Sequence, residues 1–123
     1  MNEQPLVLVA DDDEDILMLV RIRLERAGLR VVAAHDGEDA LRLARELKPR
    51  LAVLDLSMPK LGGLEVLGAL REDGADTRVV LLTAKAQEAD VERGYAAGAD
   101  AYLTKPFSPA QLVARVQALL GGT

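Results

Sequence analysis

Three carboxylates in this chain each follow a short apolar segment. Asp11 and Asp12 come directly after the run that ends at Ala10, and Asp55 follows the apolar residues 51–54. Short apolar runs that end in turn residues are typical of strands buried on both faces. Open α/β sheets carry their chemistry beyond the carboxyl ends of the strands. The pattern therefore predicts that the three carboxylates meet at one edge of a parallel sheet.

A hydroxyl and an amine follow two further predicted strands. Thr83 ends the apolar run 78–83, and Lys105 follows the run 100–104. Close carboxylates repel one another, and each pair costs on the order of 4 kcal/mol at an effective dielectric constant near 20. A divalent cation relieves this repulsion, and a few hard oxygen ligands open to water suit Mg²⁺, with Mn²⁺ as the other possibility. The sequence predicts a Mg²⁺ site beside a lysine.

A cation and a lysine around one carboxylate form a site for phosphoryl transfer. Both charges neutralise the phosphoryl oxygens while the carboxylate attacks in line, and the product is an aspartyl phosphate. Asp55 is the acid whose strand leads into a bare turn, whereas Asp11 and Asp12 begin an acidic run. We therefore expect Asp55 to be the nucleophile and the other two acids to hold the metal.

Strands and helices must alternate to bring these residues together. The predicted strands cover residues 5–10, 29–34, 51–55, 78–83 and 100–104, and the predicted helices lie between and after them, the fourth over 87–98. Ser108 is the expected N-cap of the last helix, with Pro109 at its first position. The alternation predicts an α/β fold, a flavodoxin-like (βα)5 three-layer sandwich whose five-stranded parallel sheet has the order 2-1-3-4-5.

Composition limits the possible functions. The chain has 123 residues, which suits one domain, and 15 basic against 20 acidic residues give a net charge of −5. This charge argues against direct binding of nucleic acid. The absence of cysteine excludes disulfides and thiolate metal sites. No apolar run approaches the length of a membrane span, so we expect a soluble, cytoplasmic protein.

Several motifs, in this order, resemble the receiver domain of bacterial two-component response regulators over essentially the whole chain. They are Asp11-Asp12, Asp55-Leu56-Ser57-Met58-Pro59-Lys60-Leu61-Gly62-Gly63, Thr83-Ala84 and the run from Gly98 to Phe107. The resemblance implies a single receiver domain over residues 1–123, with no output domain in this chain. It also implies a phosphoacceptor switch, capable only of its own phosphorylation and slow dephosphorylation, rather than an enzyme acting on an external substrate.

The resemblance assigns roles to residues of the metal site. Asp55 corresponds to the phosphoacceptor, which also contacts the metal. Asp12 corresponds to a direct Mg²⁺ ligand and Asp11 to a ligand acting through water. The backbone carbonyl of Ser57 corresponds to a further protein contact to the ion.

The resemblance also implies a switch. Thr83 corresponds to the hydroxyl that moves to hydrogen-bond the phosphoryl group, and Lys105 to the amine that binds it. Tyr102 corresponds to the aromatic residue that turns inward when the threonine moves. The Lys105–Pro106 peptide bond is expected to be cis. The fourth helix, fifth strand and fifth helix together form the face whose change controls partner binding.

The closest subgroup by resemblance is that of the winged-helix transcription factors. Its receivers dimerise through the fourth helix, fifth strand and fifth helix, and here Asp100 and Arg115 could form one ion pair of such a dimer. Other positions depart from the subgroup: Val91, Ala101 and Gln111 replace charged residues, and Glu92 replaces an apolar one. These departures count against dimerisation by that face and favour a different output partner. The phosphoryl donor is expected to be a histidine kinase or a phosphotransfer protein.

Two other functions compete with this interpretation. One is a small Mg²⁺-dependent phosphohydrolase with Asp11 as nucleophile and Asp13 two residues later, but that class needs a substrate pocket and a later acidic motif for which 123 residues leave no room. The other is a receiver-like module that binds its partner without phosphorylation. Retention of all five site residues argues against it.

Overall fold

Strands and helices alternate along the whole described part of the chain. The computed structural model describes residues 4–84 and 88–121. The elements are β1 (Leu6–Ala10), α1 (Glu14–Arg26), β2 (Arg30–Ala34), α2 (Gly37–Leu47), β3 (Leu51–Asp55), α3 (Gly63–Glu72), β4 (Arg78–Thr83), α4 (Glu88–Ala96), β5 (Ala101–Thr104) and α5 (Pro109–Leu119). Each predicted element is present, and the starts of three strands lie one residue later than predicted.

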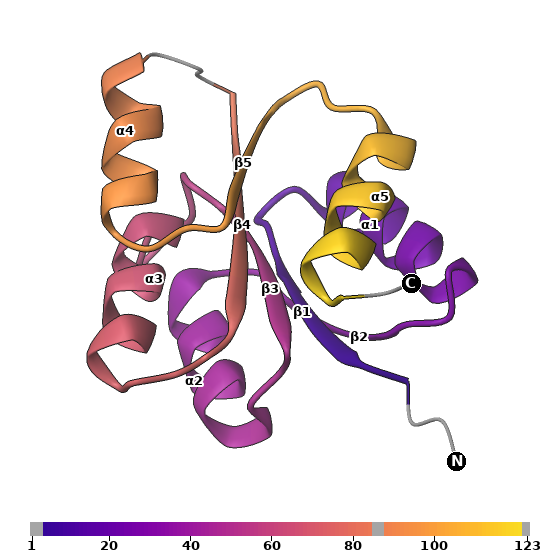
Figure 1. Ribbon diagram of the computed structural model, residues 1–123, viewed down its shortest axis with the longest axis horizontal. Helices are drawn as coiled ribbons and strands as arrows, with labels where there is room; N and C mark the ends of the chain where they lie inside the picture. Colours follow the sequence, from indigo (N-terminus) through magenta and orange to yellow (C-terminus); the bar gives the residue numbers. More distant parts are fainter. Residues whose placement is uncertain (1–3, 85–87, 122–123) are drawn as a thin grey trace.

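The five strands form one parallel sheet in the order β2-β1-β3-β4-β5. Figure 1 shows α1 and α5 on one face of the sheet and α2, α3 and α4 on the other. The predicted flavodoxin-like three-layer sandwich and its strand order are confirmed. In the register, Ala10 of β1 lies beside Leu54 of β3. Asp11, which follows β1, and Asp55, the last residue of β3, therefore emerge side by side.

Strand β3 is the middle strand, and all five of its residues are buried. Leu51 and Val53 pack into the core beneath α1 and α5, whereas Ala52 and Leu54 pack into the core beneath α2 and α3. Each fully buried leucine or valine contributes about 1.5–3 kcal/mol relative to an exposed one. Two hydrophobic cores therefore hold Asp55, the last residue of β3, at the sheet edge.

The polar residues around the helix ends act as caps. The Asp13 side chain accepts hydrogen bonds from the backbone N–H groups of Asp15 and Ile16 at the start of α1. Ser108 caps α5 and Pro109 begins it, as predicted. The fourth helix is shorter than predicted, since Gly98 has a φ of 107° and ends the helical path after Ala96; Gln87, its expected first residue, lies outside the described residues.

None of the helices in the described ranges combines the length and the apolar character needed to span a bilayer.

Candidate functional site

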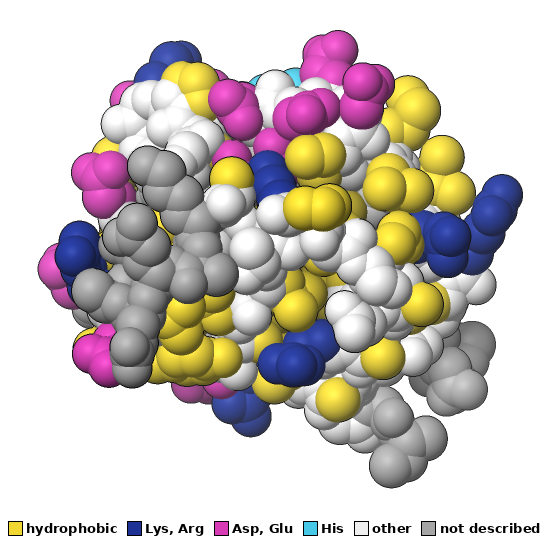
Figure 2. All heavy atoms as spheres, turned by 90° about the horizontal axis from the view of Figure 1, so that it is seen from above, with side chains coloured by type: hydrophobic (Ala, Val, Ile, Leu, Met, Phe, Trp, Pro, Cys, Tyr) yellow, Lys and Arg dark blue, Asp and Glu magenta, His cyan; other side chains and the backbone are white. Residues whose placement is uncertain are grey.

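The three acidic residues predicted to meet do lie together. Carboxylate oxygens of Asp11, Asp12 and Asp55 all lie within 4.8 Å of one another. The Asp11 side chain is completely buried, Asp55 is 4% exposed, and Asp12 is exposed. Figure 2 looks onto this edge of the sheet and shows acidic side chains gathered there. The adjacency of β1 and β3 thus creates a cluster with one open side.

Lys105 follows β5, an edge strand of the sheet, and reaches this cluster past the end of β4. Its ammonium nitrogen lies 2.9 Å from Asp11 Oδ2 and 3.2 Å from Asp55 Oδ1. The backbone N–H of Lys105 donates to the Thr83 carbonyl oxygen, and the following peptide bond to Pro106 is cis, as predicted. Sequence reasoning placed the lysine opposite Asp55 but missed its hydrogen bond to Asp11.

The electrostatics of the cluster are those of crowded acids with one compensating cation. Burial raises the pKa of Asp55, and the nearby Asp11 carboxylate raises it further, while Lys105 acts in the opposite direction. Burial by itself lowers the pKa of Lys105, but its hydrogen bond to Asp11 and the attraction of Asp55 outweigh this, so the net pKa is raised. Lys105 is therefore held as an ammonium ion, and the acids retain unrelieved negative charge.

The loop after Asp55 follows a path that only glycine permits at two positions. The Gly63 N–H donates to the Leu56 carbonyl oxygen at 3.1 Å. A Cβ atom on Gly63 would lie 2.5 Å from the Asp55 carbonyl oxygen, and one on Gly62 would lie 2.7 Å from the Leu56 carbonyl oxygen. Ser57 is exposed in this loop, two residues beyond Asp55.

The sequence matches one known protein family over most of its length. The profile of the response regulator receiver domain matches residues 7–117. The chain belongs to this family. Phosphorylation on an aspartate is general among such receivers, and they bind Mg²⁺ at an acidic pocket. They are signalling switches rather than enzymes of the ordinary kind.

Individual relatives agree with this assignment. The alkaline phosphatase synthesis transcriptional regulatory protein PhoP of Bacillus subtilis is 48% identical over 120 residues, which are 98% of this chain and 49% of PhoP. The receiver domain of a Francisella response regulator matches with a TM-score of 0.92 and 37% identity, covering 96% of this chain and 98% of that one. DrrB of Thermotoga maritima, an OmpR/PhoB homologue, matches with a TM-score of 0.88 and 37% identity, covering 97% of this chain and 54% of DrrB.

The curated relatives are transcriptional regulatory proteins and DrrB is an OmpR/PhoB homologue, which is consistent with the predicted resemblance to the winged-helix subgroup. The chain spans about half the length of the curated relatives it matches.

Thr83 and Tyr102 lie on neighbouring strands of the receiver. Thr83 ends β4 and is 4% exposed. The Tyr102 ring lies beneath α4, where a Cβ atom on Gly94 would be 3.2 Å from it, and its centroid is 6.5 Å from that of Tyr95. The Tyr102 hydroxyl is buried and has no hydrogen-bond partner in the described part of the chain. The absence of a side chain at Gly94 leaves room for the Tyr102 ring.

Asp100 has partners within the receiver itself. Its Oδ2 accepts a hydrogen bond from the Val79 N–H at 2.8 Å and lies 3.5 Å from Arg71, and its Oδ1 lies 3.6 Å from Arg78. The side chain is 21% exposed. The ion pair with Arg115 that the sequence suggested would therefore have to compete with three internal partners.

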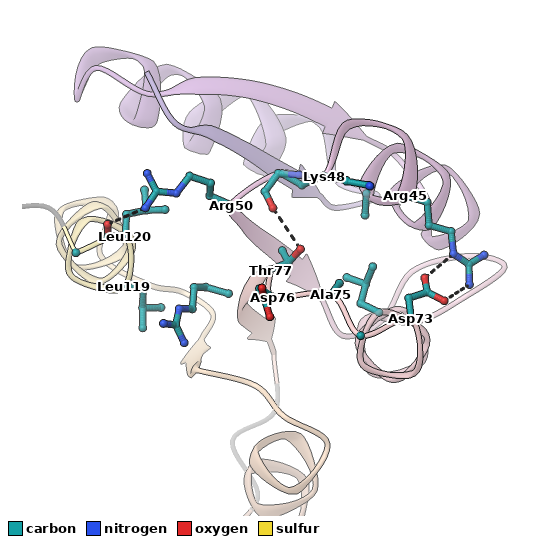
Figure 3. Close-up of a pocket in the computed structure, with 15 residues that line it drawn as sticks. Arg45, Lys48, Arg50, Asp73, Ala75, Asp76, Thr77, Leu119 and Leu120 are labelled. Atoms are coloured by element: carbon teal, nitrogen blue, oxygen red, sulfur yellow. Dashed lines mark hydrogen bonds and ion pairs between the residues drawn. The ribbon is translucent and has the colours of Figure 1, made fainter. Parts of the chain in front are cut away.

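A separate cavity of about 680 Å³ lies at the opposite edge of the sheet, near the starts of β3 and β4 (Figure 3). Arg45 and Asp73 close one side of it with an ion pair of 2.8 Å, and Lys48, Arg50 and Leu120 line other parts. None of the clustered acids lines this cavity. The cavity is therefore separate from the acidic cluster, and Lys105 does not line it either.

Proposed function

We propose that this receiver accepts a phosphoryl group on Asp55 and that the modified domain controls the binding of an output partner. The observation that carries the proposal is the position of Lys105, whose ammonium group lies 3.2 Å from Asp55 Oδ1. A carboxylate buried among acids yet touched by a cation is suited to receive an anionic group.

The acidic cluster fits a divalent cation. Asp11, Asp12 and Asp55 offer hard oxygen ligands within 4.8 Å of one another, and Lys105 neutralises only part of their charge. Such a donor set, with one exposed member, suits Mg²⁺, or Mn²⁺ in its place. The Ser57 backbone carbonyl is the proposed fourth protein contact. When bound, the ion neutralises charge on the phosphoryl oxygens during transfer.

The proposed reaction is an in-line displacement. A carboxylate oxygen of Asp55 attacks phosphorus, the new oxygen–phosphorus bond forms, and the nitrogen–phosphorus bond of a phosphohistidine donor breaks. The bonding pair stays with the imidazole, which takes up a proton from solvent. Lys105 binds one of the phosphoryl oxygens. The donor is a histidine kinase or a phosphotransfer protein.

The proposed output is a change of the face formed by α4, β5 and α5. In the proposed switch Thr83 hydrogen-bonds the phosphoryl group, and the Tyr102 ring, which already lies beneath α4 in this structure, adjusts with it. The interior Gly94 weakens α4 by about 1 kcal/mol relative to alanine, which keeps an alternative position of this helix close in energy. The related regulators act on transcription. The net charge of −5 argues against nucleic acid as the direct partner of this domain.

The test is phosphorylation by a small acyl phosphate. The protein is incubated with acetyl phosphate and Mg²⁺ and analysed by intact mass and peptide mapping. We expect one phosphoryl group, stable in acid and labile in base, that Asp55→Asn removes and that chelation of Mg²⁺ prevents. Label on Asp11 would instead favour the phosphohydrolase, and absence of any label would favour the phosphorylation-independent module.

A further inference from the structure

The start of α2 is in contact with the loop that follows β3. The Gly37 N–H donates a hydrogen bond of 3.2 Å to the Pro59 carbonyl oxygen. On either side of Gly37, Asp36 and Glu38 lie 3.6 and 3.7 Å from the Lys60 ammonium nitrogen. We refer to Gly37 with these contacts to residues 59–61 as the loop clamp.

The clamp tolerates no side chain at Gly37. A Cβ atom there would overlap the Leu61 carbonyl oxygen and would lie 2.5 Å from both the carbonyl carbon and the Cβ atom of Leu61. Two of these three neighbours are backbone atoms, which cannot rotate away as the end of a side chain can. By contrast, a Cβ atom on Gly68 of α3 would meet nothing within 4 Å. The loop therefore packs against α2 at a distance that is possible only because Gly37 has no side chain.

The backbone conformation of Lys60 is unfavourable and must be stabilised by contacts around the loop. Its φ is 72°, in the left-handed region, which costs a residue with a side chain roughly 1–2 kcal/mol. The Lys60 ion pairs with the start of α2 join this residue to the clamp. The far end of the loop is fixed as well, by the hydrogen bond from Gly63 to Leu56.

We propose that Gly37 is a positioning residue for the metal site, although α2 contributes no ligand to it. Ser57 lies between the two fixed parts of the loop, so the clamp determines where its carbonyl oxygen stands relative to Asp12 and Asp55. A side chain at Gly37 would push the loop outward and carry this oxygen away from the acids. The inference rests on the proposed function, because it assumes that Mg²⁺ binds there.

The first experiment compares two glycine substitutions in the full chain. Mg²⁺ affinity is measured by calorimetric titration for the wild type, for Gly37→Ala and for the matched control Gly68→Ala, with urea unfolding as a check on folding. We expect Gly37→Ala to weaken Mg²⁺ binding roughly tenfold, the effect typical of disturbing groups that support metal ligands. Gly68→Ala should bind Mg²⁺ like the wild type.

The second experiment needs no substitution and decides the question if Gly37→Ala does not fold. Coupling between two sites is reciprocal, so a clamp that favours Mg²⁺ binding must be tightened by Mg²⁺. We expect the amide of Gly37, which donates to Pro59, to exchange with solvent several-fold more slowly in saturating Mg²⁺. The amide of Gly28, which donates to Glu25 at the end of α1, should not change.

The outcomes separate the two proposals. If the wild type does not bind Mg²⁺, the proposed metal site is wrong. If the wild type binds Mg²⁺ while a folded Gly37→Ala binds it equally well, or while the Gly37 amide exchanges at an unchanged rate, the positioning role is wrong and the proposed function stands. A lower stability of Gly37→Ala with unchanged Mg²⁺ affinity would mean that the glycine serves packing only.

Discussion

The ammonium group of Lys105 lies 3.2 Å from a carboxylate oxygen of Asp55, although β3 and β5 are separated by β4 in the sheet. The lysine side chain therefore extends across the end of β4 to reach the acidic cluster. It also donates to Asp11 at 2.9 Å, so one cation serves two buried carboxylates. Without a metal ion the cluster is left with an excess of negative charge, and several measurable properties depend on this excess.

Asp55→Asn should stabilise the metal-free protein at neutral pH. Burial and Asp11 raise the pKa of Asp55 above its ordinary 3.8, so its contribution to the free energy of unfolding falls as the pH rises from 3.8 through the raised pKa. Asp55→Asn does not lose stability in this pH range, because asparagine does not ionise. Urea unfolding at low salt should show it more stable than the wild type by about 1 kcal/mol at pH 7, because a close like-charged pair is removed.

The difference should shrink as the pH falls through the raised pKa of the wild-type carboxyl toward 3.8, and also in Mg²⁺. Asp76→Asn serves as the control, since Asp76 is exposed and lies outside the acidic cluster. A wild type more stable than Asp55→Asn at pH 7 without metal would contradict this account of the cluster.

Lys105→Met should destabilise the metal-free protein. It leaves the fully buried Asp11 without its ammonium partner, and removing one member of a buried ion pair costs about 3 kcal/mol. Thermal or urea unfolding would measure the loss, which should become smaller when Mg²⁺ supplies positive charge. Arg42→Met is the comparison: Arg42 is 55% exposed in its ion pairs, so its loss should cost below about 0.5 kcal/mol. Equal effects of the two substitutions would rule out a special role of Lys105 in stability.

Tyr102→Phe should stabilise the unphosphorylated receiver. The Tyr102 hydroxyl is buried with no hydrogen-bond partner among the described residues, and such a group costs roughly 1 kcal/mol or more. The phenylalanine ring fills the same space beneath α4 without the buried oxygen. Tyr95→Phe, at an exposed tyrosine, should change the unfolding free energy by less than about 0.5 kcal/mol. A lower stability of Tyr102→Phe would show that the hydroxyl has a favourable contact in solution.

Phosphorylation is expected to leave the domain monomeric. Asp100 is held by Val79, Arg71 and Arg78 within the chain, and Val91 and Gln111 lack the charges of the dimerising subgroup. Gel filtration with light scattering should give one mass with and without beryllofluoride and Mg²⁺, an analogue of the phosphorylated state. A shift to a dimer would contradict the expectation and direct attention to the apolar part of the α4–β5–α5 face.

Features that depend on local pattern were predictable from the sequence. Short apolar runs marked every strand, and the parallel sheet then required Asp11, Asp12 and Asp55 to emerge at one edge. Contacts set by three-dimensional distance were not predictable. The Asp36-Gly37 pair reads as a simple turn, and nothing in the sequence indicates that Leu61 lies against it. The internal partners of Asp100 were missed for the same reason, because Arg71 reaches it from another element.

The clustered residues Asp11, Asp12, Asp55 and Lys105 come from the ends of three strands, β1, β3 and β5, with β3 in the middle of the sheet. No fragment or partly unfolded form can assemble this cluster, since release of β5 alone removes Lys105. The proposed phosphorylation of Asp55 therefore depends on the integrity of the whole domain. If Asp55 is the phosphoacceptor, an incompletely folded chain is expected to remain unphosphorylated.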